Sequence, residues 1–148
     1  MKEDMFVYKS YCELIITSDT VSSDEVSNEL DIVPHRKFNK GDEVTLKHTG
    51  RIVKRINNLW AIRSNVIVSN DEDISDHIKY LRTLLKSNMN VLREYKRNPA
   101  LEVVIWVWIE TDNAGIGFQF KEDELTFFNE IANRVQFSII TNKASIQE

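Results

Sequence analysis

Residues 101–120 read LEVVIWVWIETDNAGIGFQF, and this stretch decides the fold. Positions 101–109 are almost all apolar, with the β-branched and aromatic side chains that a strand covered on both faces requires. The turn formers at 112–115 follow, and apolar residues then recur at every second position through 116–120. We therefore predict a central strand that turns at 112–115 into a second core strand.

Length and composition indicate a single domain over residues 1–148, with an ordered core at about 11–141. A domain of this size buries roughly 68–70% of the surface that its unfolded chain exposes, so it needs no covalent staple. Cys12 is the only cysteine, which favours a reducing compartment, and we expect a cytoplasmic protein. Residues 1–4 lack the apolar core of a signal peptide, and no run approaches the roughly 18 apolar residues of a membrane span.

The flanking segments predict further strands and helices. Residues 11–17 alternate as a first strand does. Ser22 and Glu25 have the spacing of a capping box, so a short helix should begin at Ser23 and end near Asp31. Beyond an irregular basic stretch that Pro34 opens, two more strands are expected near 43–48 and 59–68.

Two later segments predict helices. Apolar residues at helical spacing place a long helix at 73–95, which Ser87-Asn88 could break in two. A third helix is expected at about 122–134, followed by a last strand at 136–141. Its inward residues should be Leu125, Phe128, Ile131, Ala132 and Val135.

The predicted order is therefore β-α-β-β-α-β-β-α-β. Three helices interleaved with about six strands, including a tight hairpin, favour an α+β fold over a doubly wound parallel one. We expect a mostly antiparallel sheet with helices packed on one face, ferredoxin-like or an elaboration of that arrangement.

Motifs of common enzymes and metal sites are absent. The chain has no phosphate-binding loop of the Walker type, no His-Glu-x-x-His, no Cys-x-x-Cys and no Gly-x-Ser-x-Gly. Cys12 alternates in phase with Leu14, so we interpret it as buried and inert. We expect no enzyme, no cofactor and no metal; an active site would need a pocket where His35, His48 and Asp42 converge.

The stretch 35–55 has seven basic residues against two acidic ones, in a chain whose net charge is −4. Such asymmetry is typical of a surface that binds an anion. Lysines and arginines at sheet edges also prevent unwanted strand pairing, and this alternative stays open. Phe38 is the only aromatic residue in the stretch, so nucleic acid is disfavoured as a ligand. The candidate binding residues are Arg36, Lys37, Lys40, Arg51, Lys54 and Arg55.

Trp106 and Trp108 should lie on one face of the central strand together with Val104, while the other face meets the helices. The tryptophan face also needs cover, from the N-terminal segment with Phe6 and Tyr8, from a second subunit or from a ligand. Trp106 and Trp108 are therefore candidate interface residues.

Several short motifs suggest a family. They are Leu30-Asp31-Ile32-Val33-Pro34 after a short helix, Lys40-Gly41-Asp42, and Leu59-Trp60 with Ser64, before a long helix and paired strands. Over residues 11–141 this combination resembles the bacterial family called domain of unknown function 4279. The first motif in that family usually reads Leu-Gly-Ile-x-Pro, so Asp31 replaces a glycine here. The resemblance implies a small bacterial cytosolic domain without assigned activity, and it transfers no catalytic residue.

The leading functional hypothesis is a non-enzymatic protein-binding domain, immunity-like or accessory, because small acidic domains of this type often accompany bacterial toxins. The expected partner is a protein such as a toxin, or a second copy of the chain, and no membrane is involved. The alternative hypothesis is a binder of a small anion or nucleic acid through residues 36–55.

Overall fold

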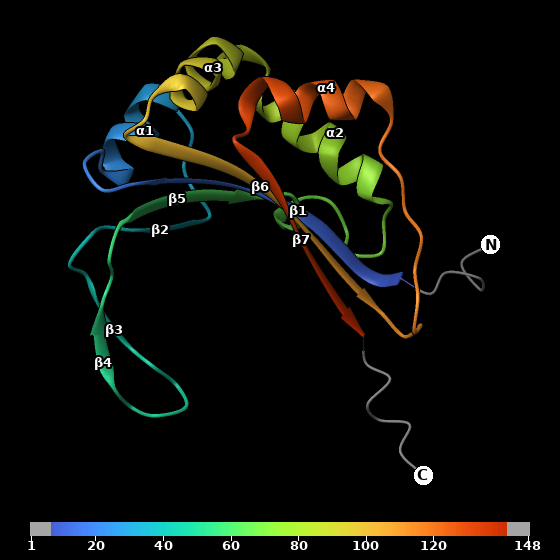
Figure 1. The fold of residues 1–148 in the computed structure, drawn as a ribbon, viewed down its shortest axis with the longest axis horizontal. Helices are drawn as coiled ribbons and strands as arrows, with labels where there is room; N and C mark the ends of the chain where they lie inside the picture. Colours follow the sequence, from blue (N-terminus) through green and yellow to red (C-terminus); the bar gives the residue numbers. More distant parts are fainter. Residues whose placement is uncertain (1–6, 142–148) are drawn as a thin grey trace.

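A five-stranded sheet with helices packed on one face organises the computed structural model, which describes residues 7–141 (Figure 1). The strand order is β2-β5-β1-β6-β7, and all neighbours are antiparallel except β6 and β7. The strands of this sheet are β1 (Val7–Ser18), β2 (Arg36–Phe38), β5 (Asn58–Arg63), β6 (Leu101–Thr111) and β7 (Arg134–Thr141). The predicted α+β class and mostly antiparallel sheet are confirmed, whereas a ferredoxin-like topology is not confirmed by this order.

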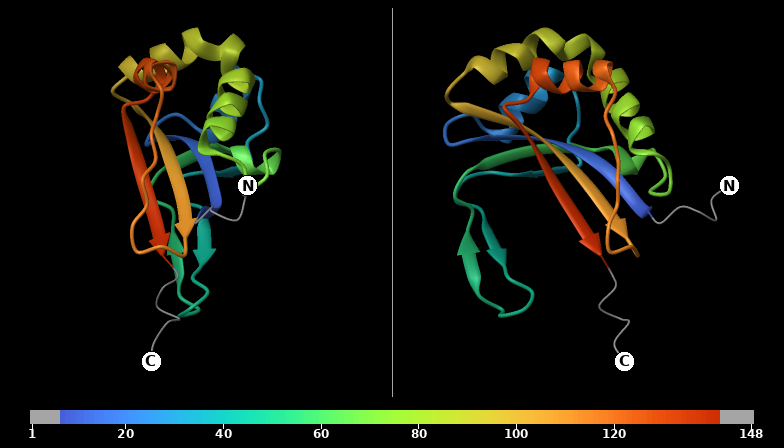
Figure 2. Two further views of the ribbon diagram at one scale, coloured as in Figure 1. Left: turned by 90° about the vertical axis from the view of Figure 1, so that its right-hand side faces the viewer. Right: turned by 45° about the vertical axis from the view of Figure 1, so that its right-hand side comes forward.

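Two short strands form a separate hairpin. β3 (Glu43–Thr45) pairs with β4 (Ile52–Lys54), and Figure 2 shows this hairpin extending away from the sheet on the side opposite the helices. We call residues 40–55 the basic hairpin. The prediction of strands near 43–48 and 59–68 found β3 and β5 but missed β2 and β4.

The helices begin and end largely where the sequence indicates. They are α1 (Ser23–Leu30), α2 (Ile74–Leu85), α3 (Met89–Arg97) and α4 (Glu122–Ile131). Ser22 Oγ accepts a hydrogen bond from the Glu25 backbone N–H at 3.1 Å, which confirms the predicted cap of α1. The predicted break of the long helix is also confirmed, since a 3₁₀ turn at Lys86–Asn88 separates α2 from α3.

The core lies between the sheet and the helices. β1 contributes Cys12, Leu14 and Ile16, and each is at most 2% exposed. The helix-facing residues of β6 are buried as predicted; they are Val103, Ile105, Val107 and Ile109. Trp60 of β5 is fully buried, and its Nε1 donates to Ser27 Oγ of α1 at 3.0 Å. Burial of side chains of this size stabilises the fold by roughly 1.5–3 kcal/mol each.

The predicted strand at 116–120 is wrong, because this segment is irregular. β6 pairs with β7 in parallel, so the chain must cross the helix-covered face between them, and α4 forms that crossover. The aromatic side chains of this segment instead pack it against α4 and β7. The Phe120 ring lies 5.2 Å from the ring of Phe128 in α4 and 6.0 Å from that of Phe137 in β7.

The end of the chain also differs from expectation. Leu125 is 53% exposed rather than inward, and Phe127 is buried in its place. α4 ends at Ile131 because Asn133 is already hydrogen-bonded to β6: its side-chain oxygen accepts from the Val103 N–H, and its own N–H donates to the Val103 carbonyl, both at 2.8 Å. β7 therefore starts at Arg134, two residues earlier than predicted.

Asp31 ends α1 in a left-handed conformation, with φ 54° and ψ 43°. It is the one residue other than glycine with positive φ in the part of the chain that the structure describes. Glycine adopts this conformation without strain, which explains why a glycine suits this position.

Replacing Asp31 by glycine is therefore expected to raise the free energy of unfolding by about 0.5–1 kcal/mol. Urea denaturation of the purified protein measures this change. Asp31→Ala is the control, since alanine keeps the strained Cβ and gains nothing. A glycine variant no more stable than the alanine variant would refute the assignment.

Candidate functional site

The face of the sheet turned away from the helices, called the open face below, has no helix over it in residues 7–141 (Figure 2). It nevertheless buries a small apolar cluster. Ile15, Leu59, Ala61 and Val104 are each at most 8% exposed, and Phe38 and Trp106 pack against them. Large side chains of the sheet itself therefore provide the cover that a second layer would otherwise give.

Three aromatic rings lie in a row on the open face. Trp106 and Trp108 of β6 have ring centroids 6.0 Å apart, and Tyr11 of β1 stacks on Trp108 at 5.8 Å. All three are only partly buried. Trp106 Nε1 donates to Ser138 Oγ at 2.8 Å, whereas the buried Nε1 of Trp108 has no hydrogen-bond partner among the described residues.

The predicted cover of these rings by the N-terminal segment is not tested. Phe6 and the side chain of Tyr8 lie outside the described residues. Within the described part, the open face presents the aromatic row at its surface.

A buried carboxylate bound by two arginines lies next to the aromatic row. Glu13 of β1 is 3% exposed, and it accepts hydrogen bonds from Arg36 of β2 and Arg63 of β5. Arg36 Nη2 lies 3.0 Å from Oε1, and Arg63 Nε lies 2.7 Å from Oε2. This hydrogen bond raises the pKa of Arg63 above its ordinary value. The cluster has two cations and one anion, so one positive charge remains uncompensated at the surface.

The backbone beside this cluster is held by His35. Its Nδ1 accepts a hydrogen bond from the Arg63 N–H at 2.7 Å, which requires an unprotonated Nδ1. Burial, with the Arg63 charge as a second cause, lowers the pKa of His35 below 6.5. The neutral ring is therefore the form that fixes the end of β5 near neutral pH.

The structure divides the six predicted basic residues into two groups. Arg36 binds Glu13, Lys37 forms an ion pair with Asp24 at 3.1 Å, and the Arg55 guanidinium lies 4.1 Å from the centre of the Phe38 ring. The side chains of the other three form no ion pair with any residue in the described range; they are Lys40, Arg51 and Lys54. The sequence analysis missed Glu13 and Arg63, because nothing in the local sequence links them to Arg36.

Positive charge is concentrated on this side of the molecule. The open face has four cations against three carboxylates, and the basic hairpin has five against two. The open-face set is Lys9, Arg36, Arg63 and Arg134 with Glu13, Glu102 and Glu110. The rest of residues 7–141 has eight cations against fifteen carboxylates, so charge is distributed very unevenly over the described part of the chain.

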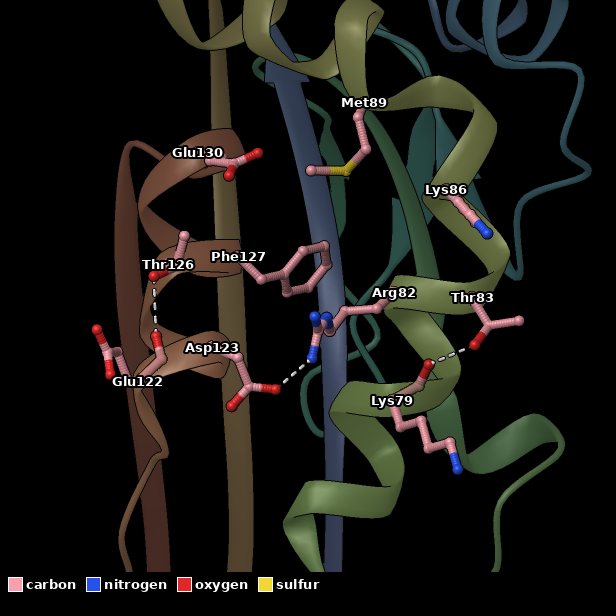
Figure 3. Close-up of a pocket in the computed structure, with 10 residues that line it drawn as sticks. All are labelled: Lys79, Arg82, Thr83, Lys86, Met89, Glu122, Asp123, Thr126, Phe127 and Glu130. Carbon is pink, nitrogen blue, oxygen red and sulfur yellow. Dashed lines mark hydrogen bonds and ion pairs between the residues drawn. The ribbon is translucent and has the colours of Figure 1, made fainter.

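A groove of about 870 Å³ lies on the opposite side, between α2 and α4 (Figure 3). Lys79 and Lys86 line its α2 wall, and carboxylates such as Glu122 line its α4 wall. Arg82 crosses it to Asp123 at 2.7 Å, and this hydrogen bond lowers the pKa of that carboxyl. Because the charges on the two walls compensate each other, the groove has no excess charge to select a ligand.

A second pocket of about 710 Å³ lies where α2 begins, beneath the crossing segment 113–121. Its charged lining is Glu72, Asp73 and Asp76 with Lys121. No group of three or more potential metal ligands is assembled anywhere in residues 7–141.

The residues considered for an enzyme do not form a site. Asp42 accepts from the Asn39 N–H and His48 is exposed in the basic hairpin, so within the described residues no hydrogen bond joins either to His35. Cys12 is buried as predicted, and burial raises the pKa of its thiol. Among the helices described, none is long and apolar enough to cross a bilayer.

Comparison with known proteins gives one match. A family model described as Domain of unknown function (DUF4279) matches residues 8–142. No curated protein and no solved structure matches the chain. The matched range includes all the strands and helices that form the open face and its helical layer.

Replacing Glu13 by glutamine is expected to lower the free energy of unfolding by about 1–3 kcal/mol, because two guanidiniums then face each other without the buried anion. Glu110→Gln is the matched control: it removes a surface carboxylate 3.6 Å from Lys9, and such pairs contribute less than about 1 kcal/mol. Urea denaturation measures both changes. An equal decrease in the free energy of unfolding in the two variants would mean that the Glu13 cluster stabilises the fold no more than a surface ion pair does.

Proposed function

The chain belongs to the DUF4279 family, and we propose that it is a non-enzymatic protein-binding domain that uses the open face and the basic hairpin to bind an acidic partner protein. Family membership confirms the resemblance drawn from the sequence. The observation that carries the proposal is the row of partly buried aromatic rings beside an uncompensated guanidinium charge.

The aromatic row has the composition of an interface centre. Tryptophan, tyrosine and arginine contribute most of the binding energy in protein interfaces. All three occur on the open face, where two arginines bind Glu13 and Glu13 lies opposite Trp106. The rings are already packed against one another, so little side-chain entropy is lost when a partner covers them.

The basic hairpin adds apolar contact area and charge. Ile52 is 63% exposed and Ile56 is 81% exposed, next to the unpaired Arg51 and Lys54. Apolar side chains interspersed with cations favour an acidic protein surface over a simple anion. The hairpin extends on the same side as the open face, so one partner can contact both (Figure 1).

An immunity-like or accessory role in the bacterial cytoplasm is the biological setting that we propose, with a toxin as the partner. Its support is the analogy with small acidic domains that accompany bacterial toxins. Because the open face and the basic hairpin are positively charged, we expect this partner to have an acidic binding surface.

The test compares protein capture by matched variants. Trp108→Ala removes the centre of the aromatic row, and affinity for the captured partner should fall by roughly 30-fold or more. Arg51→Glu combined with Lys54→Glu reverses two exposed hairpin charges and should weaken binding about tenfold, increasingly so at low salt. Native lysate identifies the partner by mass spectrometry, and the purified pair then gives Kd values.

The control is Lys79→Glu combined with Lys86→Glu, which makes the same charge change on α2 and the 3₁₀ turn that follows it, far from the open face. This variant should bind as the parent protein does. Equal capture by all variants, or no partner at all, would refute the proposal. Circular dichroism and the thermal midpoint show that each variant is folded.

A second candidate function is binding of a small anion or nucleic acid through the basic hairpin. It is favoured by Lys40, Arg51 and Lys54, which have no ion pair in the described range. Affinity for inorganic phosphate or a short oligonucleotide should then fall steeply with ionic strength and vanish when all three charges are reversed. Binding that is absent, or unaffected by salt, excludes this function.

A further inference from the structure

We propose that the outer edge of β7 is a self-association site, where β7 of a second copy pairs antiparallel with it and joins two five-stranded sheets into one. This surface is distinct from the open face, and it goes beyond the proposed function. The inference starts from the position of β7 at the end of the sheet.

β7 is an edge strand without the usual protection against pairing. It has eight residues, β6 is the only strand in the described range that pairs with it, and it contains neither proline nor lysine. The opposite edge is well protected: β2 has three residues, follows Pro34 and exposes Lys37. Natural proteins blunt their edges with such short strands, prolines and lysines, so the unprotected edge of β7 needs another explanation.

The helix-side residues of β7 form an apolar strip at this edge. Phe137 and Ile139 are each 46% exposed, and Phe118 of the crossing segment, 37% exposed, lies with its ring 5.7 Å from Phe137. Figures 1 and 2 show that the C-terminal half of β7 extends past α4. Apolar side chains beside an open strand edge favour strand addition.

A two-fold axis at Ser138 would place the apolar strip of one copy beside the same strip of the second copy. Antiparallel pairing places residues of the same face opposite each other, so Phe137 of one copy meets Ile139 of the other, twice. The most exposed apolar residues of the strand are thereby paired. An identical patch on both partners is what a closed two-fold dimer requires, and this favours a second copy over an unrelated peptide.

Charge presents no obstacle to this arrangement. Arg134 is the only charged residue in β7, and its guanidinium already binds Glu102 and the side-chain oxygen of Gln136. The two Arg134 side chains lie at opposite ends of the paired strands. Because the contact is narrower than a standard interface, we expect a Kd in the micromolar range or weaker.

Disulfide cross-linking tests the register directly. In Ser138→Cys the two introduced thiols lie opposite each other across the axis, with Cα atoms about 4.5–5.5 Å apart, as a disulfide needs. Gln136→Cys is the matched control, since its copies would lie about 13 Å apart along the paired strands. Mild oxidation should link the first variant and leave the second unlinked; the native Cys12 is buried and does not compete.

Light scattering tests the same edge of β7 without introducing a disulfide. The parent protein should show a mass that rises with concentration up to about 100 μM, and Ile139→Lys should stay monomeric. Ile67→Lys is the control, because Ile67 is 69% exposed but lies outside β7, and it should associate as the parent does. A monomeric parent protein, or a dimer that persists in Ile139→Lys and does not cross-link through residue 138, would overturn the proposal.

Discussion

The antiparallel pairing of β1 with β6 is the interaction on which the rest of the structure depends. Its register places Leu14 opposite Ile105 on the helix side and Glu13 opposite Trp106 on the open face. A slip by one residue would turn either Glu13 toward the helices or Trp106 and Trp108 into the core. Both the hydrophobic core and the candidate binding surface therefore follow from one ladder of backbone hydrogen bonds.

The two faces of this ladder use their side chains differently. The helix side buries aliphatic residues completely, whereas the open face covers a small cluster with Phe38 and Trp106, and arginines bind Glu13 beside them. Amphipathic residues can do this because their stems and rings are apolar while their polar ends remain near water. The same property suits them to recognition, so the cover of the sheet and a binding surface are made of the same side chains.

The sequence predicted what local patterns encode and missed what depends on distant neighbours. The cap at Ser22, the break at Ser87-Asn88 and the burial of Cys12 follow from residues a few positions apart. The partners of Glu13 are 23 and 50 residues away, so no local signal could find that cluster. The strand prediction at 116–120 failed for a related reason. Alternating apolar residues form a strand only when a neighbouring strand is available to pair with, and β7 occupies the position beside β6.

The parallel pairing of β6 with β7 determines how the two proposed surfaces, the open face and the outer edge of β7, are related. A parallel neighbour requires a crossover, and α4 provides it on the helix side, so no described strand pairs with the outer edge of β7. An axis perpendicular to the sheet keeps the faces of two paired copies on the same side. Their open faces would then form one surface with two binding positions, and a partner with repeated acidic sites would be held more tightly than by either copy alone.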